Sequence, residues 1–237
     1  MVSKNTIERK LRSDAYSAFV TESLNTAKCT TAVFINKAFS GSLEQSPQNL
    51  TRRIISKSAR GTQHGRITEL PTIDRSHHIF MPFFGGADGQ AALRLVLQLA
   101  ENPETTVTVV HYRIRVEGKG SEDAITAKGL PEGKVRISSS MDTSDDDFFV
   151  TVQRTLPDPL HPRVTFRTTI SYDPVQDAVS DAQNEVGQVG NGGDLIVLGR
   201  NVEMVEAQNS SCLGLVADVM LERDVKASVV VVQSRRE

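Results

Sequence analysis

The sequence lacks tryptophan, contains two cysteines, and draws only 5% of its 237 residues from the aromatic types. Cys29 and Cys212 occur without a CxxC motif or a Cys/His spacing, which argues against a metal site and against a disulfide framework. No apolar run approaches the roughly 18 to 20 residues of a membrane span. The formal net charge of -2 offers no basic surface to nucleic acid. We therefore expect a soluble protein of a reducing compartment, without a metal or a nucleic-acid partner.

The most informative stretch that is present lies in the first half of the chain. His77 to Phe84 is an apolar run, Gly85 to Asp88 is a glycine-rich turn, and residues 91–100 are again almost entirely apolar. This succession predicts a buried parallel strand, a tight βα turn and a covering helix. The abundance of Val, Leu and Ala favours an α/β fold over a β-sandwich for the same reason.

The turn itself carries the local chemistry. Gly85 and Gly86 permit positive φ and a close approach of the backbone, and Asp88 precedes a helix whose first amides need acceptors. We expect Asp88 to cap that helix. The alternative is a ligand site, because open α/β sheets bind ligands at such turns and a helix start favours anions. Without a phosphate-binding motif, capping alone is the favoured interpretation.

The rest of the chain repeats the pattern of strand and helix. The expected strands cover residues 105–116, 164–170, 194–200 and 228–232. One expected helix follows the acidic run at 142–147, and two more cover residues 174–186 and 213–221. The acidic run Asp142, Asp145, Asp146 and Asp147 is explained better as a helix start than as a cation site. The order βαβαβαβαβ predicts a five-stranded, parallel, Rossmann-like sheet.

The two ends of the chain match each other. A helix within residues 4–28 precedes the strand Thr31 to Ile35, and Leu24 lies seven residues before Thr31, as Leu221 lies seven before Ser228. Two helix–strand junctions can look alike by chance, but we prefer a repeat. Residues 1–39 are then the last helix and strand of a truncated first unit, and this orphan strand should pair with the sheet edge formed by 228–232.

The domain boundaries follow from composition. Residues 40–75 are polar, with scattered Gly and Pro, and read as a linker; residues 76–237 form one complete α/β domain. Within that domain, residues 117–147 are rich in Gly, Ser and Asp and are expected to be a mobile insertion.

Several segments together resemble a known family. His78 to Asp88 followed by Ala91 to Leu95 looks like the central segment of the cytosolic C-terminal region of fungal K+/H+ antiporters, in the monovalent cation:proton antiporter-2 family, and of plant cation/H+ exchangers. The weaker matches are Val107 to Tyr112, Asp194 to Arg200, Ser228 to Gln233, and Cys29 before Val33 to Ile35. The resemblance covers nearly the whole chain except residues 40–70 and 117–147.

The resemblance implies two units like universal stress proteins behind a membrane antiporter domain. Such units often bind AMP or ATP, and Asp88, Val110 and Gly199 stand at comparable places. However, Val202 replaces the second phosphate-binding glycine, and Leu215 follows Gly214 where Ser or Thr is usual. A triphosphate needs those amides and hydroxyls, so we expect weak nucleotide binding or none. The candidate crevice consists of Gly85, Gly86, Asp88, Val110, His111, Gly199, Arg200 and Gly214.

The leading functional interpretation is a regulatory or dimerisation module that modulates K+/H+ exchange by an attached transporter at the cytosolic face of a membrane. The inputs to consider are a nucleotide, pH or a cation; His77, His78 and His111 are the candidate pH sensors, with a structural or surface role as the alternative. A free-standing nucleotide-binding stress protein is the second interpretation. We do not expect an enzyme, because no nucleophile elbow, Walker sequence or metal-binding histidine pair is present.

Overall fold

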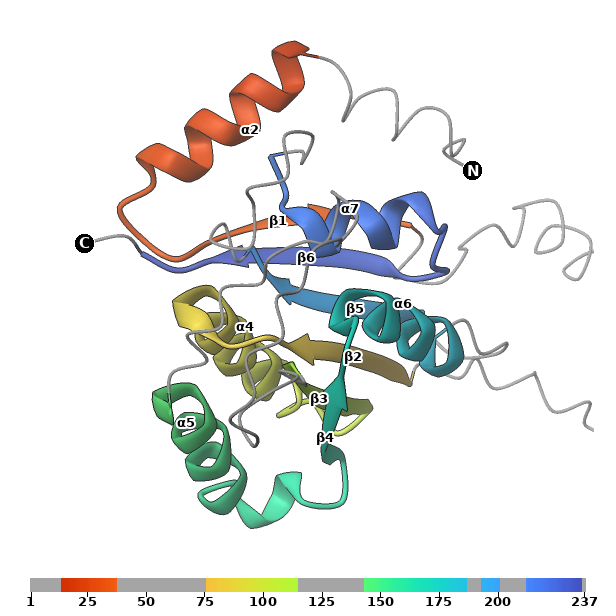
Figure 1. The fold of residues 1–237 in the computed structure, drawn as a ribbon. Helices are drawn as coiled ribbons and strands as arrows, with labels where there is room; N and C mark the ends of the chain where they lie inside the picture. Colours follow the sequence, from red (N-terminus) through yellow and green to blue (C-terminus); the bar gives the residue numbers. More distant parts are fainter. Residues whose placement is uncertain (1–13, 38–75, 115–142, 187–192, 201–211, 236–237) are drawn as a thin grey trace, which may run out of the picture.

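The computed structural model describes residues 14–37, 76–114, 143–186, 193–200 and 212–235. These residues form a six-stranded sheet in the order β1-β6-β5-β2-β3-β4 with helices packed on it (Figure 1). The strands are β1 Thr31–Ile35, β2 His77–Phe83, β3 Thr105–Ile114, β4 Val164–Ser171, β5 Asp194–Gly199 and β6 Ser228–Gln233. The helices are α2 Asp14–Thr26, α4 Gly86–Leu99, α5 Thr143–Arg154, α6 Pro174–Glu185 and α7 Leu215–Glu222, with a 3-10 turn at Asp158–Leu160.

The predicted α/β architecture is confirmed. Strands β2 to β6 pair in parallel with their neighbours, and β1 joins β6 in antiparallel sense. From β2 the chain moves outward through β3 to β4, and it then returns to β5 and β6 on the other side of β2. The order therefore reverses between β2 and β5, and the carboxyl ends of these two strands flank the switch point where open α/β sheets bind ligands.

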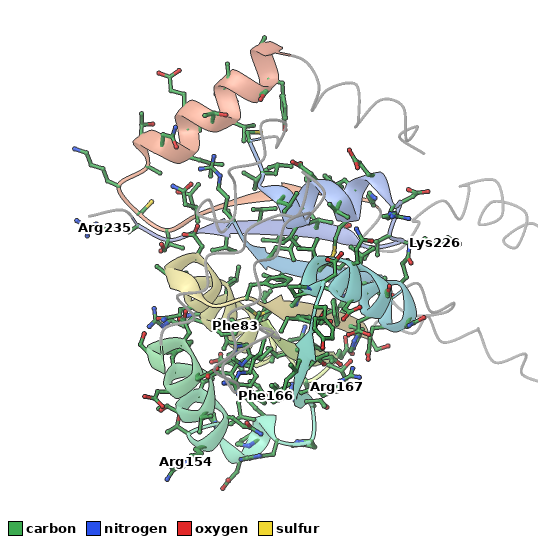
Figure 2. The ribbon with its side chains drawn as sticks, in the orientation of Figure 1. Phe83, Arg154, Phe166, Arg167, Lys226 and Arg235 are labelled. Atoms are coloured by element: carbon green, nitrogen blue, oxygen red, sulfur yellow. The ribbon has the colours of Figure 1, made fainter. Side chains whose placement is uncertain are left out.

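Both faces of the sheet are covered, which explains why β2 is apolar at successive positions. Ile79, Met81 and Phe83 face the layer that contains α4 and α5, whereas Phe80 faces the layer that contains α6 and α7. All four side chains are at most 1% exposed. Phe149 of α5 contacts the rings of Phe83 and Phe166, two residues that are labelled in Figure 2.

Strand β1 occupies the edge of β6, as the sequence match predicts. The register pairs Val33 with Val231, and Val33 and Ile35 share the core layer of Val229 and Val231. The sequence match aligns Val33 with Val230, but Val33 lies on the face of Val229 and Val231, and Val230 lies on the opposite face. The difference matters because a one-residue shift turns every side chain of a strand to the opposite face.

Some sequence expectations fall outside the described residues. These are the linker 40–75, the stretch before Asp14, and the insertion up to residue 142. The end of the predicted insertion is the first turn of α5, with Asp145 and Asp146 in it, so the acidic run does begin a helix. The assignment of residues 1–39 to an earlier unit stays a prediction.

Candidate functional site

The site candidate is the β2–α4 turn at the switch point. Gly85 and Gly86 have φ of 81° and 73°, a region that glycine enters without steric cost, and Gly85 is the N-cap residue of α4. The turn directs the Gly86 amide outward from the helix start. It thus creates the amide-lined, electropositive helix end that the sequence predicts.

A carboxylate from α5 occupies this helix end. Asp145 accepts a hydrogen bond from the Gly86 amide at 2.9 Å and another from the Gln90 side-chain amide at 3.0 Å. A Cβ on Gly85 would lie 2.5 Å from the Asp145 Oδ2 atom. The glycine is therefore required here for the close approach of an internal anion, and an external anion at this amide would have to displace Asp145.

Asp88 does not cap the helix, which corrects the sequence prediction. Helix α4 begins three residues earlier than a cap at Asp88 requires, with Gly85 as its N-cap residue, so Asp88 lies within the first turn. Its Oδ1 atom instead accepts from the backbone amide and hydroxyl of Ser234 at 2.7 and 2.8 Å. Asp88 thereby fastens the segment that follows β6 to the start of α4.

Gly199 and Gly214 serve close packing. A Cβ on Gly199 would lie 2.6 Å from the Gly89 amide nitrogen and 2.8 Å from the Asp88 carbonyl carbon, so β5 can touch α4 only through a glycine. Gly214, at φ 93°, is the N-cap residue of α7, and a Cβ there would collide with the Arg200 carbonyl oxygen. The sequence places both glycines in the candidate phosphate-binding crevice, but in the structure each packs against backbone atoms of the protein itself.

Arg200 joins three parts of the molecule. Its side chain is 9% exposed; Nε donates to the Cys212 carbonyl at 2.9 Å, and Nη1 donates to the side-chain carbonyl of Gln233. Gln233 in turn donates to the Leu24 carbonyl of α2 at 2.7 Å. Arg200 therefore holds the start of α7, the end of β6 and the N-terminal helix together.

Val110 and His111 point to opposite faces of β3. Val110 is 1% exposed and lies in the layer of α6 and α7. His111 is 2% exposed, with its ring centroid 5.2 Å from Phe83 and 4.7 Å from Phe149 of α5. The two residues therefore do not line one crevice wall together.

The imidazole of His111 faces a charge pair. Its Nε2 atom lies 3.6 Å from Asp146 Oδ1, and Asp146 Oδ2 pairs with the Arg113 guanidinium at 2.6 Å. Among the described residues, this buried Nε2 has no hydrogen-bond partner. Burial lowers the pKa of His111 below its usual 6.5, and Arg113 acts in the same direction, while Asp146 and Asp145 oppose the shift.

The site thus consists of two adjacent contacts between α5 and the carboxyl edge of the sheet. Asp145 binds the glycine turn, and Asp146 faces His111, which lies beside Phe83 in the strand register. Asp145, Gln90 and Ser234 are the participants that the sequence analysis missed. The acidic run was visible, but nothing local indicates that its second member reaches a turn 59 residues earlier.

The arrangement has a limited chemical repertoire. It offers an amide-lined helix end that is filled by the Asp145 carboxylate, and a buried imidazole, that of His111, beside the Asp146 carboxylate. In the described residues no group of three His, Cys, Asp or Glu side chains could hold a metal ion, and no helix there is long and apolar enough to cross a membrane.

The fold and the switch-point turn define an α/β domain of the open-sheet, doubly wound class. The chain is 26% identical over 215 residues to Cation/H(+) antiporter 3 of Arabidopsis thaliana, a match that covers 90% of this chain and 22% of that protein. A universal stress protein family structure from Burkholderia pseudomallei matches with a TM-score of 0.35 and 16% identity, over 67% of this chain and 96% of that one. No family model matches the sequence.

Proposed function

We propose that the chain is a cytosolic regulatory module of a cation/H+ antiporter, and that it modulates K+/H+ exchange without catalysing a reaction. The observation that carries the proposal is the match of 90% of this chain to 22% of a cation/H+ antiporter. A module of this kind needs a site that responds to an input, and the contacts of α5 with the switch-point turn supply one. The assignment to a fungal antiporter of the monovalent cation:proton antiporter-2 family belongs to the same proposal.

The input that the site favours is the proton. His111 is buried beneath α5, and protonation would place a cation between Phe149 and Asp146, whose carboxylate already pairs with Arg113. The new charge would compete with Arg113 for Asp146 and would alter how α5 sits on the sheet. Because burial lowers the pKa of His111 below its usual 6.5, the buried imidazole is neutral at neutral pH, and this proton is taken up only when the cytosol becomes acidic.

The test measures K+/H+ exchange in vesicles that contain the full-length protein, across roughly pH 6 to 8. We expect removal of residues 76–235 to change the rate or its pH dependence. We expect His111→Gln and Asp146→Asn to shift the pH profile, since each removes one member of the facing pair. His161→Gln is the matched control, because His161 is 56% exposed and lies in the turn after α5. Exchange that is unaffected by the deletion would refute the regulatory role.

Nucleotide binding is the alternative function, and the contacts do not favour it. The Gly86 amide, to which a phosphate would bind, already donates its hydrogen bond to the Asp145 carboxylate. Gly199 and Gly214 pack closely against backbone atoms, and the Arg200 side chain is hydrogen-bonded inside the protein. We expect titration calorimetry with AMP and with ATP to show weak binding or none. A clear saturable heat for either nucleotide would restore the alternative.

A further inference from the structure

Strand β4 forms the end of the sheet opposite to β1 (Figure 1), and within the described residues it pairs on one side only, with β3. Its sequence, Val-Thr-Phe-Arg-Thr-Thr-Ile-Ser, contains no lysine or proline, two residue types that discourage pairing at an edge. Its one charged side chain, that of Arg167, forms an ion pair with Glu185 at the end of α6. The edge of β4 is therefore not protected against a further strand, since its single charge is already neutralised within the domain.

The hydrogen bonds to β3 determine which backbone groups of β4 point to the open edge. The Arg163 carbonyl, immediately before the strand, accepts from the Val107 amide of β3 at 2.8 Å. Because both backbone groups of a strand residue point to the same side and successive residues alternate, the odd-numbered residues of β4 bond to β3. The even-numbered residues Phe166, Thr168 and Ile170 therefore direct their amides and carbonyls toward the open edge.

The even-numbered side chains of β4 form a row on the face that α5 covers. Val164 and Phe166 pack in the core layer that contains Phe149 of α5. Ile170 continues this row, because alternate side chains of a strand share a face, and Tyr172 follows directly after the strand. Ile170 and Tyr172 are 65% and 62% exposed. The first half of the row is thus packed beneath α5, whereas its second half is apolar and exposed.

The two halves of the row complement each other when β4 pairs with a second β4 in antiparallel sense. The two symmetric pairings that use nearly all of the strand are centred on Arg167 and on Thr168. The first places two arginines directly opposite each other, which is destabilising. The second makes the two copies of Thr168 a hydrogen-bonded pair and places Ile170 opposite the partner's Phe166. A foreign strand could use the same backbone groups, but this match of one half to the other favours a second copy.

We propose that the edge of β4 is the docking surface for a second copy of this chain, paired in antiparallel sense about Thr168 so that the two sheets become continuous. The two-fold axis is then perpendicular to the sheet, and the α5 helices of both copies lie on the same face. The partner's Ile170 covers Phe166, whose ring centroid is 5.4 Å from that of Phe149, and Phe149 is 4.7 Å from His111. The second copy thereby extends the apolar layer around the candidate site. The inference goes beyond the regulatory role and does not depend on it.

The first test is disulfide cross-linking of the 237-residue chain by diamide. Thr168→Cys and Thr165→Cys are a matched pair, because both replace an exposed threonine of β4. In the proposed pairing the two copies of position 168 are opposite each other, with Cα atoms about 5.5 Å apart, which a disulfide can span. Position 165 lies opposite the partner's Ser171, so its two copies are roughly 20 Å apart along the strands. We expect Thr168→Cys to cross-link at least about tenfold faster than Thr165→Cys, whose thiols cannot be bridged without backbone movement. Both variants carry Cys29→Ser, because Cys29 is exposed.

The second test measures mass by size-exclusion chromatography with light scattering over a range of concentrations. We expect the unmodified chain to reach twice its single-chain mass of 25.9 kDa. Ile170→Lys should stay at the single-chain mass, because the new ammonium group would face the partner's Phe166. Phe19→Lys is the matched control, since Phe19 is 67% exposed on α2 at the other end of the sheet, and it should associate like the unmodified chain. Both substitutions replace exposed side chains, so neither removes a core contact.

Each of the other outcomes overturns the proposal. A single-chain mass at every concentration would show that no second copy docks, and thiol labelling of Thr168→Cys would then distinguish an edge covered by this chain, which labels slowly, from an open one. A dimer that survives Ile170→Lys, or one that is lost in Phe19→Lys, would place the interface elsewhere. Equal cross-linking of the two cysteine variants would attribute it to random collision. Since transport is not measured, none of these results bears on the antiporter assignment.

Discussion

At the scale of single residues, the contact between β5 and α4 depends on two glycines that face each other. We expect Gly199→Ala to reduce the free energy of unfolding by about 1–3 kcal/mol, because the new methyl group would meet backbone atoms of Asp88 and Gly89 that cannot rotate away. Urea denaturation measures this loss.

Gly89→Ala is the matched control for that contact. Its Cβ would lie 3.3 Å from the edge of the Phe83 ring, and alanine gains about 1 kcal/mol over glycine in a helix. We therefore expect a distinctly smaller loss. If both variants lost equal stability, the close approach of β5 to α4 would not be the reason.

His111 makes stability depend on pH in a known direction. Burial lowers the pKa of His111 in the native state, so below 6.5 the unfolded chain binds a proton that the native state resists. This group's contribution to stability is complete above pH 6.5 and is lost as the pH falls toward the lowered native pKa. We expect His111→Gln to flatten the decline of the free energy of unfolding on acidification, measured by urea denaturation at a series of pH values.

The exposed His161 provides the comparison for this effect. His161→Gln should leave the pH dependence as it is in the unmodified chain, because the His161 side chain is 56% exposed and folding removes little water from it. A slope that is the same for His111→Gln and the unmodified chain would contradict the burial argument.

The residue scale is also where the sequence was least informative. Gly85 and Gly86 were correctly expected at a positive φ, because only the local chain determines that requirement. The partners of Asp88 and Arg200 were not predictable, because they come from Ser234 and Gln233 at the far end of the chain. Side-chain partners depend on which strands become neighbours, and a local pattern does not contain that information.

At the scale of elements, α5 is held on the sheet by the two acids in its first turn. We expect Asp145→Ala to leave the Gly86 amide without its acceptor and to cost about 1 kcal/mol, the usual worth of a helix-capping interaction. Backbone hydrogen exchange in α5 should become faster, because its link to α4 is lost. Exchange rates measured by mass spectrometry would show this.

Asp147→Ala tests whether charge alone explains that result. Asp147 lies in the same helix and is exposed, so the substitution removes the same charge without removing the Gly86 contact. We expect little change in α5 exchange. Equal acceleration in both variants would attribute the effect to the helix dipole and not to the bond across the site.

Elements were predictable where the apolar period was strong. The observed bounds are close to the expected ones for strands β2, β5 and β6, which are buried on both faces. The same holds for helix α4, which buries one clear face. The antiparallel sense of β1 and its one-residue shift were not predictable. Both depend on how β1 aligns with the valine-rich β6, and Thr31 to Ile35 offers no charged residue that fixes a single register.

At the scale of the whole molecule, the sheet ends in β1 on one side and β4 on the other. β6 is rich in valine, from Val229 to Val232, and carries no lysine or proline that would discourage strand pairing. Its outer edge is covered by β1, and Gln233 bonds to Leu24 of α2 across the same junction. The N-terminal helix and strand therefore protect the domain from association through β6.

Removal of residues 1–37 should expose that edge. We expect the truncated chain to show a higher apparent mass than a chain that lacks only residues 1–13, because β6 can pair with β6 of a second copy much as it pairs with β1. Size-exclusion chromatography with light scattering over a range of concentrations measures the difference. The shorter truncation keeps α2 and β1 and controls for the loss of chain. Equal masses at every concentration would show that β1 pairs with β6 but is not what prevents β6 from pairing with a second copy.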